Sequence, residues 1–153
     1  MKTTDEKWMR LALEEAKIAA QAGEVPIGAV VVRNGELISQ AHNLCVTNAD
    51  ATAHAELLAI SQACQSLGSW RLSDSTLYVT LEPCPMCAGA AINARVSRIV
   101  YAAKDPRAGA CESLIRLPKY PLESAPACES GLLGDESIEL LRAFFSKMRK
   151  KKT

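Results

Sequence analysis

Two short motifs in this sequence carry side chains that bind metals or transfer protons: His54-Ala55-Glu56 and Cys84-Pro85-Met86-Cys87. By itself, the Cys-x-x-Cys motif is compatible with a redox dithiol of the thioredoxin kind, with half of a structural zinc site, or with a metal site of another kind. A structural zinc site needs two more ligands at similar spacing. The other four cysteines are isolated and are typical of small buried side chains (Cys45, Cys64, Cys111 and Cys128).

The histidine motif favours a catalytic metal site. His54 and Cys84 are each predicted at the start of a helix, and the i, i+3 spacing puts Cys84 and Cys87 on one side of the first turn. If adjacent elements bring the two helix N-termini together, the three ligands converge, and the helix dipoles favour the thiolates. Three protein ligands leave the fourth tetrahedral position open, as in catalytic zinc sites. We therefore predict one Zn²⁺ on His54, Cys84 and Cys87.

Glu56 is the predicted catalytic residue. An acid in the first turn of a helix is often placed there by the helix dipole alone. Residues i and i+2 do not share a helix face, so Glu56 is poorly placed as a ligand beside His54 but can reach the open side of the metal. Zinc lowers the pKa of bound water to about 7, and a carboxylate there can carry a proton to a leaving group.

The elements that must position these residues alternate along the chain. We expect strands over 27–33, 36–41, 76–80 and 98–102 and near 122–128, and helices ending at Gly23 and over 54–67, 85–94 and 135–150. Asn34-Gly35 predicts a tight hairpin turn between the first two strands. This order predicts an α/β fold of three layers, α-β-α, with a mixed central sheet of about five strands and helices on both faces.

Composition predicts one globular domain over residues 1–153, with 48% hydrophobic and 23% charged residues. The net charge of +1 identifies no partner, but six basic residues and no acidic one lie between positions 142 and 153 (Arg142, Lys147, Arg149, Lys150, Lys151 and Lys152). No apolar run reaches the roughly 18 residues of a membrane helix. The first residues lack the apolar region of a signal peptide, so we expect a cytoplasmic protein without membrane contact.

The combination His-x-Glu and Pro-Cys-x-x-Cys is the signature of zinc nucleobase deaminases. From about residue 7 to residue 150 the chain resembles one branch of the cytidine/deoxycytidylate deaminase superfamily, the bacterial tRNA-specific adenosine deaminases. The resemblance rests on these stretches: 12–16 (ALEEA), 23–30 (GEVPIGAV), 42–43 (HN), 52–56 (TAHAE), 77–90 (LYVTLEPCPMCAGA), 105–109 (DPRAG) and 144–145 (FF).

The resemblance implies a cytidine-deaminase-like fold, a homodimer with one zinc per subunit, and hydrolytic deamination of the wobble adenosine in a tRNA anticodon stem-loop to inosine. Glu56 would move a proton to the ring nitrogen and then to the departing ammonia. Asn43 would hydrogen-bond the base, and the main chain at Ala55 and Pro83 would help to hold it. Glu24, Asp105 and Phe145 complete the expected substrate-binding residues, with the basic end as a further RNA contact.

The chain also departs from the family pattern. Ala51 follows Asp50 where a proline is usual, Glu112 replaces a glycine, and 117–121 (LPKYP) stands where the family has Leu-Asn-His. Three alternative functions remain at this point. They are a deaminase of a free base or nucleoside of the guanine or cytosine type, a thioredoxin-like redox protein, and a zinc module that binds RNA without catalysis.

Overall fold

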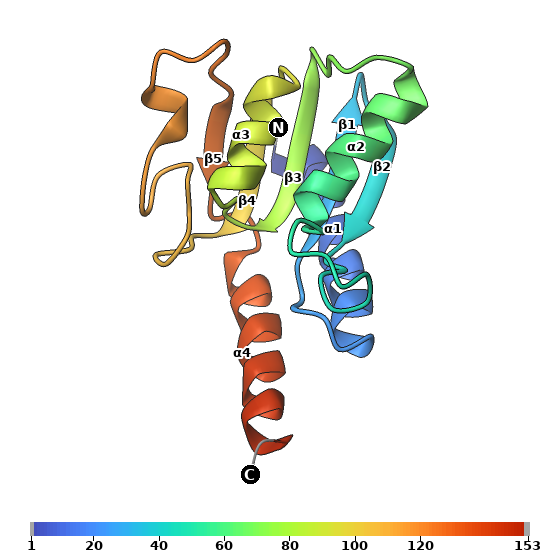
Figure 1. Cartoon of the computed structure of the whole chain (residues 1–153), viewed down its shortest axis with the longest axis vertical. Coiled ribbons are helices and arrows are strands. Elements are labelled where there is room, and N and C mark those ends of the chain that lie inside the picture. The colour runs from blue at the N-terminus through green and yellow to red at the C-terminus, as the bar shows by residue number, and fades with distance from the viewer. Residues whose placement is uncertain (1, 152–153) are drawn as a thin grey trace.

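The computed structural model describes residues 2–151, with side chains from residue 4 onward. Its centre is one mixed sheet with the strand order β2-β1-β3-β4-β5 (Figure 1). The strands are β1 (Gly28–Arg33), β2 (Glu36–His42), β3 (Ser75–Leu81), β4 (Arg98–Ala103) and β5 (Ala127–Ser130). Among the described residues, no helix is both long and apolar enough to cross a lipid bilayer.

The first two strands form the predicted hairpin. Asn34 and Gly35 have φ angles of 52° and 74°, the left-handed conformation that the tightest hairpin turn requires at both central positions. The antiparallel register pairs Gly28 with His42 and Arg33 with Glu36, with an irregularity between Val31 and Val32. The hairpin therefore fixes where β2 ends, and so where the chain leaves the sheet toward the first motif.

The topology places the starts of two helices at one edge of the sheet. β2 and β3 both run antiparallel to β1, which lies between them, so they are parallel to each other. The helix α2 (Ala55–Leu67) follows β2, and α3 (Pro85–Asn93) follows β3. Both helices therefore begin at the edge formed by the carboxyl ends of these strands. β3 also pairs in parallel with β4, the strand that follows α3 in the chain.

Helices cover both faces of the sheet, which confirms the three-layer α-β-α fold. α2 and α3 pack on one face, where Leu77 and Val79 of β3 join a buried cluster with Ala59. α1 (Lys2–Gln21) covers the other face, where Tyr78 lies in a second cluster with Met9. α4 (Gly134–Lys151) is fixed near its start by the Ser137 hydroxyl, which donates to the Thr80 carbonyl at 2.5 Å. It then projects past the edge at which α2 and α3 begin (Figure 1).

The last strand lies later in the chain than the sequence pattern predicts. β5 is Ala127–Ser130, whereas the expected strand was near 122–128. Proline has no backbone N–H, so Pro121 and Pro126 cannot donate to a sheet ladder. Pairing begins directly after Pro126, where the Ala127 N–H donates to the Ser97 carbonyl at 3.0 Å.

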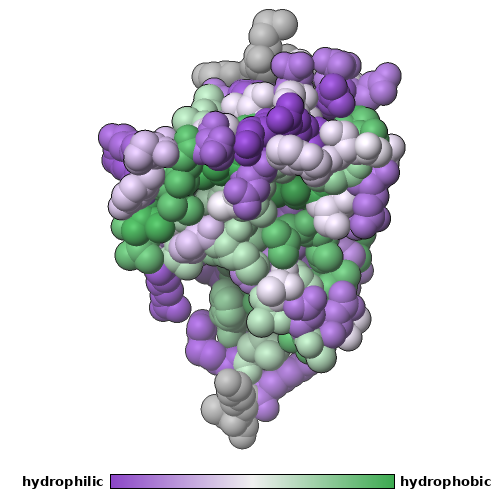
Figure 2. Space-filling model, turned by 45° about the horizontal axis from the view of Figure 1, so that its top comes forward, coloured by the Kyte–Doolittle hydropathy of each residue, from purple (hydrophilic) through white to green (hydrophobic). Residues whose placement is uncertain are grey.

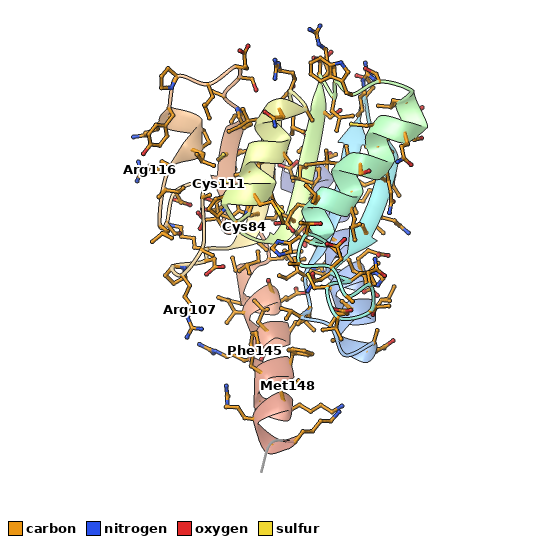
Figure 3. All side chains as sticks on the ribbon, in the orientation of Figure 1. Cys84, Arg107, Cys111, Arg116, Phe145 and Met148 are labelled. Atoms are coloured by element: carbon orange, nitrogen blue, oxygen red, sulfur yellow. The ribbon has the colours of Figure 1, made fainter. Side chains whose placement is uncertain are left out.

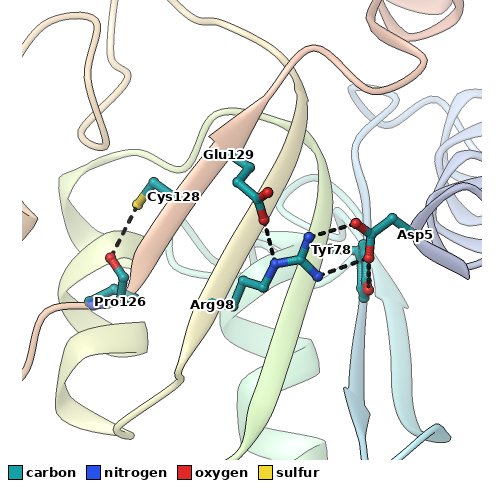
Figure 4. A network of polar contacts seen from close by, with 6 residues as sticks. All are labelled: Asp5, Tyr78, Arg98, Pro126, Cys128 and Glu129. Carbon is teal, nitrogen blue, oxygen red and sulfur yellow. Dashed lines mark hydrogen bonds and ion pairs between the residues drawn. The ribbon is translucent and has the colours of Figure 1, made fainter. Parts of the chain in front are cut away.

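Arg98 at the start of β4 ties α1 to the sheet (Figure 4). Its guanidinium donates to both carboxylate oxygens of Asp5, at 2.8 and 2.5 Å, and its Nε donates to Glu129 on β5. The Tyr78 hydroxyl donates to the same Asp5 carboxylate at 2.6 Å. The hydrogen bonds from Arg98 hold the pKa of Asp5 below its ordinary value, and burial raises the pKa of Tyr78.

This network predicts a pH-dependent contribution to stability. Asp5→Asn is expected to lower the free energy of unfolding by about 2 kcal/mol at neutral pH, because charge-assisted hydrogen bonds are lost. The pKa of Asp5 is lower in the folded protein, so this stabilisation is complete above the unfolded pKa of about 3.9 and is lost as the pH falls through the folded value. Urea unfolding of both proteins at about pH 7 and about pH 3 measures the difference, which should shrink in acid. An equal difference at both pH values would contradict the assignment.

Candidate zinc centre and active site

The predicted metal ligands stand at the first residues of the two helices that share a sheet edge. His54 is the N-cap of α2 and Cys84 is the N-cap of α3, both with extended backbone (ψ 149° and 172°). Neither side chain caps its own helix by a hydrogen bond, so the imidazole and the thiol are available to a metal. Cys87 lies one turn into α3 and is buried.

The three ligand atoms have the spacing of a tetrahedral zinc site. His54 Nδ1 lies 3.5 Å from Cys84 Sγ and 3.6 Å from Cys87 Sγ, and all three atoms lie within 4.8 Å of one another. Zinc binds imidazole nitrogen at about 2.0 Å and thiolate sulfur at about 2.3 Å, so a tetrahedral site separates such atoms by about 3.6 Å. The donor set and its geometry therefore fit zinc. Figure 3 shows Cys84 at this edge of the sheet.

The charges around the cysteines favour a thiolate. Contact with the Cys87 thiol lowers the pKa of Cys84 to about 5, and the nearby backbone N–H groups of Cys87 and Met86 and the charge of His54 lower it further. The same sulfur–sulfur contact and burial raise the pKa of Cys87. These opposite shifts favour the thiolate form on Cys84 and the thiol form on Cys87. A divalent cation would release the second proton.

Glu56 lies beside the ligands and away from water. Its side chain is buried, and desolvation raises its pKa to about 7. The Cys87 thiol is a hydrogen-bond partner of this carboxylate, and the charges of His54 and Cys84 act on its pKa. A carboxyl group that gains and loses a proton near neutral pH has the property that general acid–base catalysis requires.

Zinc content tests the ligand set directly. The purified protein is expected to hold about one zinc per chain, and Cys87→Ser is expected to lose most of it, because a hydroxyl is a poor zinc ligand. Cys64→Ser is the matched control: Cys64 lies on α2, where its thiol donates only to the Trp70 carbonyl. Elemental analysis measures both variants. Full zinc content in Cys87→Ser, or a Cys84–Cys87 disulfide in the purified protein, would contradict this assignment.

Asn43 belongs to the loop that leads from β2 to His54, and Glu24, which lies between α1 and β1, contacts that loop. Asn43 follows β2 directly, is buried, and accepts a hydrogen bond from the Cys45 thiol at 3.1 Å. Glu24 is fully buried, and its two oxygens accept the N–H groups of Val46 (3.1 Å) and Thr47 (2.6 Å). Burial would raise the pKa of Glu24, but these bonds hold it below its ordinary value. The Glu24 carboxylate thus holds the loop, and a contact with substrate stays a prediction.

The main chain at Ala55 and Pro83 lies next to the ligands, as the sequence required. Ala55 is fully buried in the first turn of α2. The Pro83 carbonyl accepts the Ala110 N–H at 2.8 Å, which fixes the 105–113 loop beside Cys84. Asp105 begins this loop, and its Oδ1 accepts the N–H groups of Arg107 (3.0 Å) and Ala108 (3.4 Å). The Asp105 side chain therefore shapes its own turn.

Phe145 lies on the projecting part of α4, beyond the catalytic edge. Its side chain is exposed, and its ring meets Phe144 edge-on at 5.4 Å between centroids. Figure 3 shows Phe145 and Met148 on α4, and Arg107 extending from its loop on the same side of the sheet edge. Lys152 of the basic end lies outside the described residues. The structure does not bring Phe145 to the metal ligands, so any substrate contact must involve a molecule that extends along α4.

Sequence reasoning missed Glu82, the residue between β3 and Pro83. Its carboxylate is buried and accepts five hydrogen bonds from the 105–113 loop: from the backbone N–H groups of Asp105, Cys111, Glu112 and Ser113, and from the Ser113 hydroxyl. These bonds hold the pKa of Glu82 below its ordinary value despite burial. A charged residue at the end of an otherwise apolar buried strand is the sequence signal that could have identified it.

Glu112, the acid that replaces a family glycine, is paired with residues of β4 and of the segment directly after it. The Tyr101 hydroxyl donates to Glu112 Oε1, and Lys104 Nζ lies 3.6 Å from its Oε2. Lys104 therefore partly neutralises the negative charge of Glu112. An acid at this position would repel a bound polyanion, and these partners reduce that repulsion.

Comparison with known proteins identifies the family. A family model described as MafB19-like deaminase matches residues 3–148. The tRNA-specific adenosine deaminase of Bacillus subtilis (strain 168) is 51% identical over 151 residues, covering 98% of this chain and 94% of that protein. The chain belongs to the tRNA-specific adenosine deaminase family. The corresponding protein of Agrobacterium fabrum is 48% identical to this deaminase and covers 93% of it and 94% of its own length.

Two solved structures of deaminases have the same fold as this chain. The deaminase superposes with a TM-score of 0.86 and 48% identity on a protein studied for A-to-I editing by tRNA:A34 deaminases at the wobble position, covering 88% of this chain and 99% of that one. Guanine deaminase from Nitrosomonas europaea matches with a TM-score of 0.78 and 29% identity, covering 92% of this chain and 84% of that one. The deaminase fold thus serves more than one substrate class.

Proposed function

We propose that this chain is a zinc-dependent hydrolase that converts the wobble adenosine of a tRNA anticodon to inosine. The observation that carries the proposal is the convergence of His54, Cys84 and Cys87 beside the buried Glu56. The relatives at 51% and 48% identity, which match nearly the whole chain, support the substrate class. Water replaces the 6-amino group of adenine, and ammonia leaves.

Glu56 carries the proton transfers of this reaction. Bound zinc supplies an acidified water as the nucleophile. The Glu56 carboxylate would accept a proton from that nucleophile and deliver it to N1 of adenine. It would then accept the proton of the new hydroxyl on C6 and deliver it to the departing amino nitrogen, so that ammonia leaves and C6 becomes a carbonyl. Its pKa of about 7 suits both roles, because the proton affinities of donor and acceptor are then closely matched at neutral pH.

The placement of the remaining site residues supports the binding of RNA. The buried Asn43, next to the half-buried Cys45 thiol, supports an amide contact to the base. An anticodon loop must present an unstacked base, and its phosphates need cations nearby. α4 extends past the catalytic edge with Phe145 exposed and with Arg149, Lys150 and Lys151 in its last turn. We assign α4 to the flanking nucleotides and Asp105 to the wall of the base pocket.

We also propose a homodimer and a cytoplasmic location for a single deaminase domain. The face on the α2 and α3 side carries apolar patches (Figure 2). α3 contributes the half-buried Met86 and Ala90 to this side, a surface suited to a second copy of this chain. A protomer mass in sedimentation equilibrium would exclude the dimer.

The six free cysteines support a reducing compartment, where tRNA is modified.

The decisive experiment offers the protein two substrates. An anticodon stem-loop with adenosine at the wobble position is incubated with the zinc-loaded protein and sequenced after reverse transcription, where inosine reads as guanosine. Free guanine is tested in parallel for ammonia release. We expect conversion of the wobble adenosine and no reaction with guanine. Ammonia from guanine with an unchanged stem-loop would overturn the proposal in favour of a free-base deaminase.

A further inference from the structure

The buried carboxylate of Glu82 lies between two parts of the candidate site. On one side, the chain continues through Pro83 to the zinc ligand Cys84. On the other side, Oε1 accepts the Asp105 N–H (3.0 Å), and Oε2 accepts the N–H groups of Cys111, Glu112 and Ser113, at 3.1, 2.8 and 2.9 Å. The Ser113 hydroxyl completes the set at 2.5 Å from Oε1. A carboxylate presents only acceptors, and every one of these partners is a donor.

The space around this carboxylate is as restricted as its hydrogen bonding. A Cβ added to Gly109 would lie 2.3 Å from the carboxyl carbon of Glu82 and 2.5 Å from each oxygen. No other residue fits at position 109 unless the carboxylate moves. Gly109 and Glu82 therefore form one packing unit, in which the loop passes directly over the carboxylate.

The turn at Asp105 is closed internally but has few anchors to the rest of the site. Asp105 Oδ1 and its carbonyl accept the N–H groups of residues 107–109, so the turn keeps its shape by its own bonds. Among the described residues, two backbone N–H groups connect the turn to the segment before Cys84: the Asp105 N–H donates to Glu82, and the Ala110 N–H donates to the Pro83 carbonyl. Loss of the first tie would let the turn shift as a unit.

We propose that Glu82 is a positioning residue that sets the distance between the Asp105 turn and the zinc ligands and thereby the fit of the substrate. This inference rests on the proposed function, in which the Asp105 turn forms one wall of the nucleotide pocket. Glu82 acts through the loop and does not take part in proton transfer.

Glu82→Gln tests this role because the carboxamide changes a single loop contact. Its NH₂ group cannot face the three N–H donors at Oε2 without three donor–donor conflicts, so it takes the Oε1 position. There, the Ser113 hydroxyl can rotate to accept, but the Asp105 N–H loses its partner. We expect the KM for the anticodon stem-loop to rise about tenfold, with kcat changed less than about threefold. Zinc content should be unchanged.

Two further variants separate positioning from general stability. Ser113→Ala removes the hydroxyl bond but keeps the Asp105 tie, so KM should stay at the wild-type value. Gly109→Ala displaces the carboxylate from the opposite side and should reproduce the rise in KM. It also carries the test if Glu82→Gln does not fold. A wild-type KM in Glu82→Gln, or a fall in kcat together with loss of zinc, would overturn the proposal.

Hydrogen–deuterium exchange distinguishes this proposal from the proposed function. In Glu82→Gln, amides in a peptide covering 104–109 should exchange faster than in the wild type, while those of 111–113 stay protected. This readout needs no substrate. If the wild-type protein left the stem-loop unchanged, the proposed function would fall, and the exchange result would still decide whether Glu82 holds the turn. Unchanged exchange over 104–109 would show that it does not.

Discussion

Glu56→Gln is expected to abolish deamination and leave zinc in place. The carboxylate accepts and releases a proton in each half of the reaction, and a carboxamide of the same shape can do neither. Loss of a general acid–base group lowers kcat by a factor of about 10² to 10⁴. Because His54, Cys84 and Cys87 are untouched, zinc content should remain at the wild-type level. Single-turnover conversion of the stem-loop and elemental analysis measure the two quantities.

The control for this experiment is Glu36→Gln. Glu36 is an exposed residue of β2 next to the hairpin turn, so the same change of charge there should leave both rate and zinc content unchanged. Normal turnover in Glu56→Gln would show that Glu56 does not carry the proton transfers. Loss of zinc in Glu56→Gln would instead make Glu56 part of the ligand set.

Gly28→Ala is expected to lower the free energy of unfolding more than Gly68→Ala or Gly109→Ala. Gly28 begins β1 where α1 crosses it, and an added Cβ would lie 2.0 Å from the Ala12 carbonyl oxygen and 2.7 Å from the Ala16 backbone nitrogen. Both contacts are with helix backbone, which cannot rotate away as a side chain can. The helix must move off the sheet, at a cost of about 3 kcal/mol or more. Thermal and urea unfolding measure this loss.

Gly68→Ala is the comparison that separates steric contact from backbone strain. Gly68 ends α2 with φ +66°, and a Cβ there meets nothing within 4 Å. Its substitution should cost only about 1 kcal/mol, the cost of placing alanine in the left-handed conformation. Equal losses of stability in the two variants would contradict a steric clash between a side chain at position 28 and the backbone of α1.

The local features of the site follow from the sequence because short-range chemistry determines them. Asn34-Gly35 specifies the tight turn, Gly68 ends α2 in the left-handed conformation, and Pro85 begins α3 directly after Cys84. Each of these depends on the backbone preferences of one or two residues. The types of the ligands and their positions at helix starts were therefore predictable, as was the three-layer order of elements.

Partners that are distant along the chain were not predictable from such patterns. Nothing near Glu24 in the sequence indicates that its carboxylate binds the N–H groups of Val46 and Thr47, and nothing near Glu82 indicates the 105–113 loop. Glu112 is expected to disturb RNA binding if its sequence position alone is considered, but the fold directs it to Tyr101. A buried carboxylate has no local signature, because its donors come from whichever backbone the topology brings close.

The sequence by itself determined which atoms can hold zinc and which group can carry a proton, because residue type sets ligand chemistry and acidity. Only the tertiary structure decided that these atoms meet. β2 and β3 run parallel on either side of β1, so the helices that follow them start at one edge and bring His54 within 3.6 Å of both sulfurs. Burial then moves the pKa of Glu56 to about 7, because removal of water disfavours its charged form.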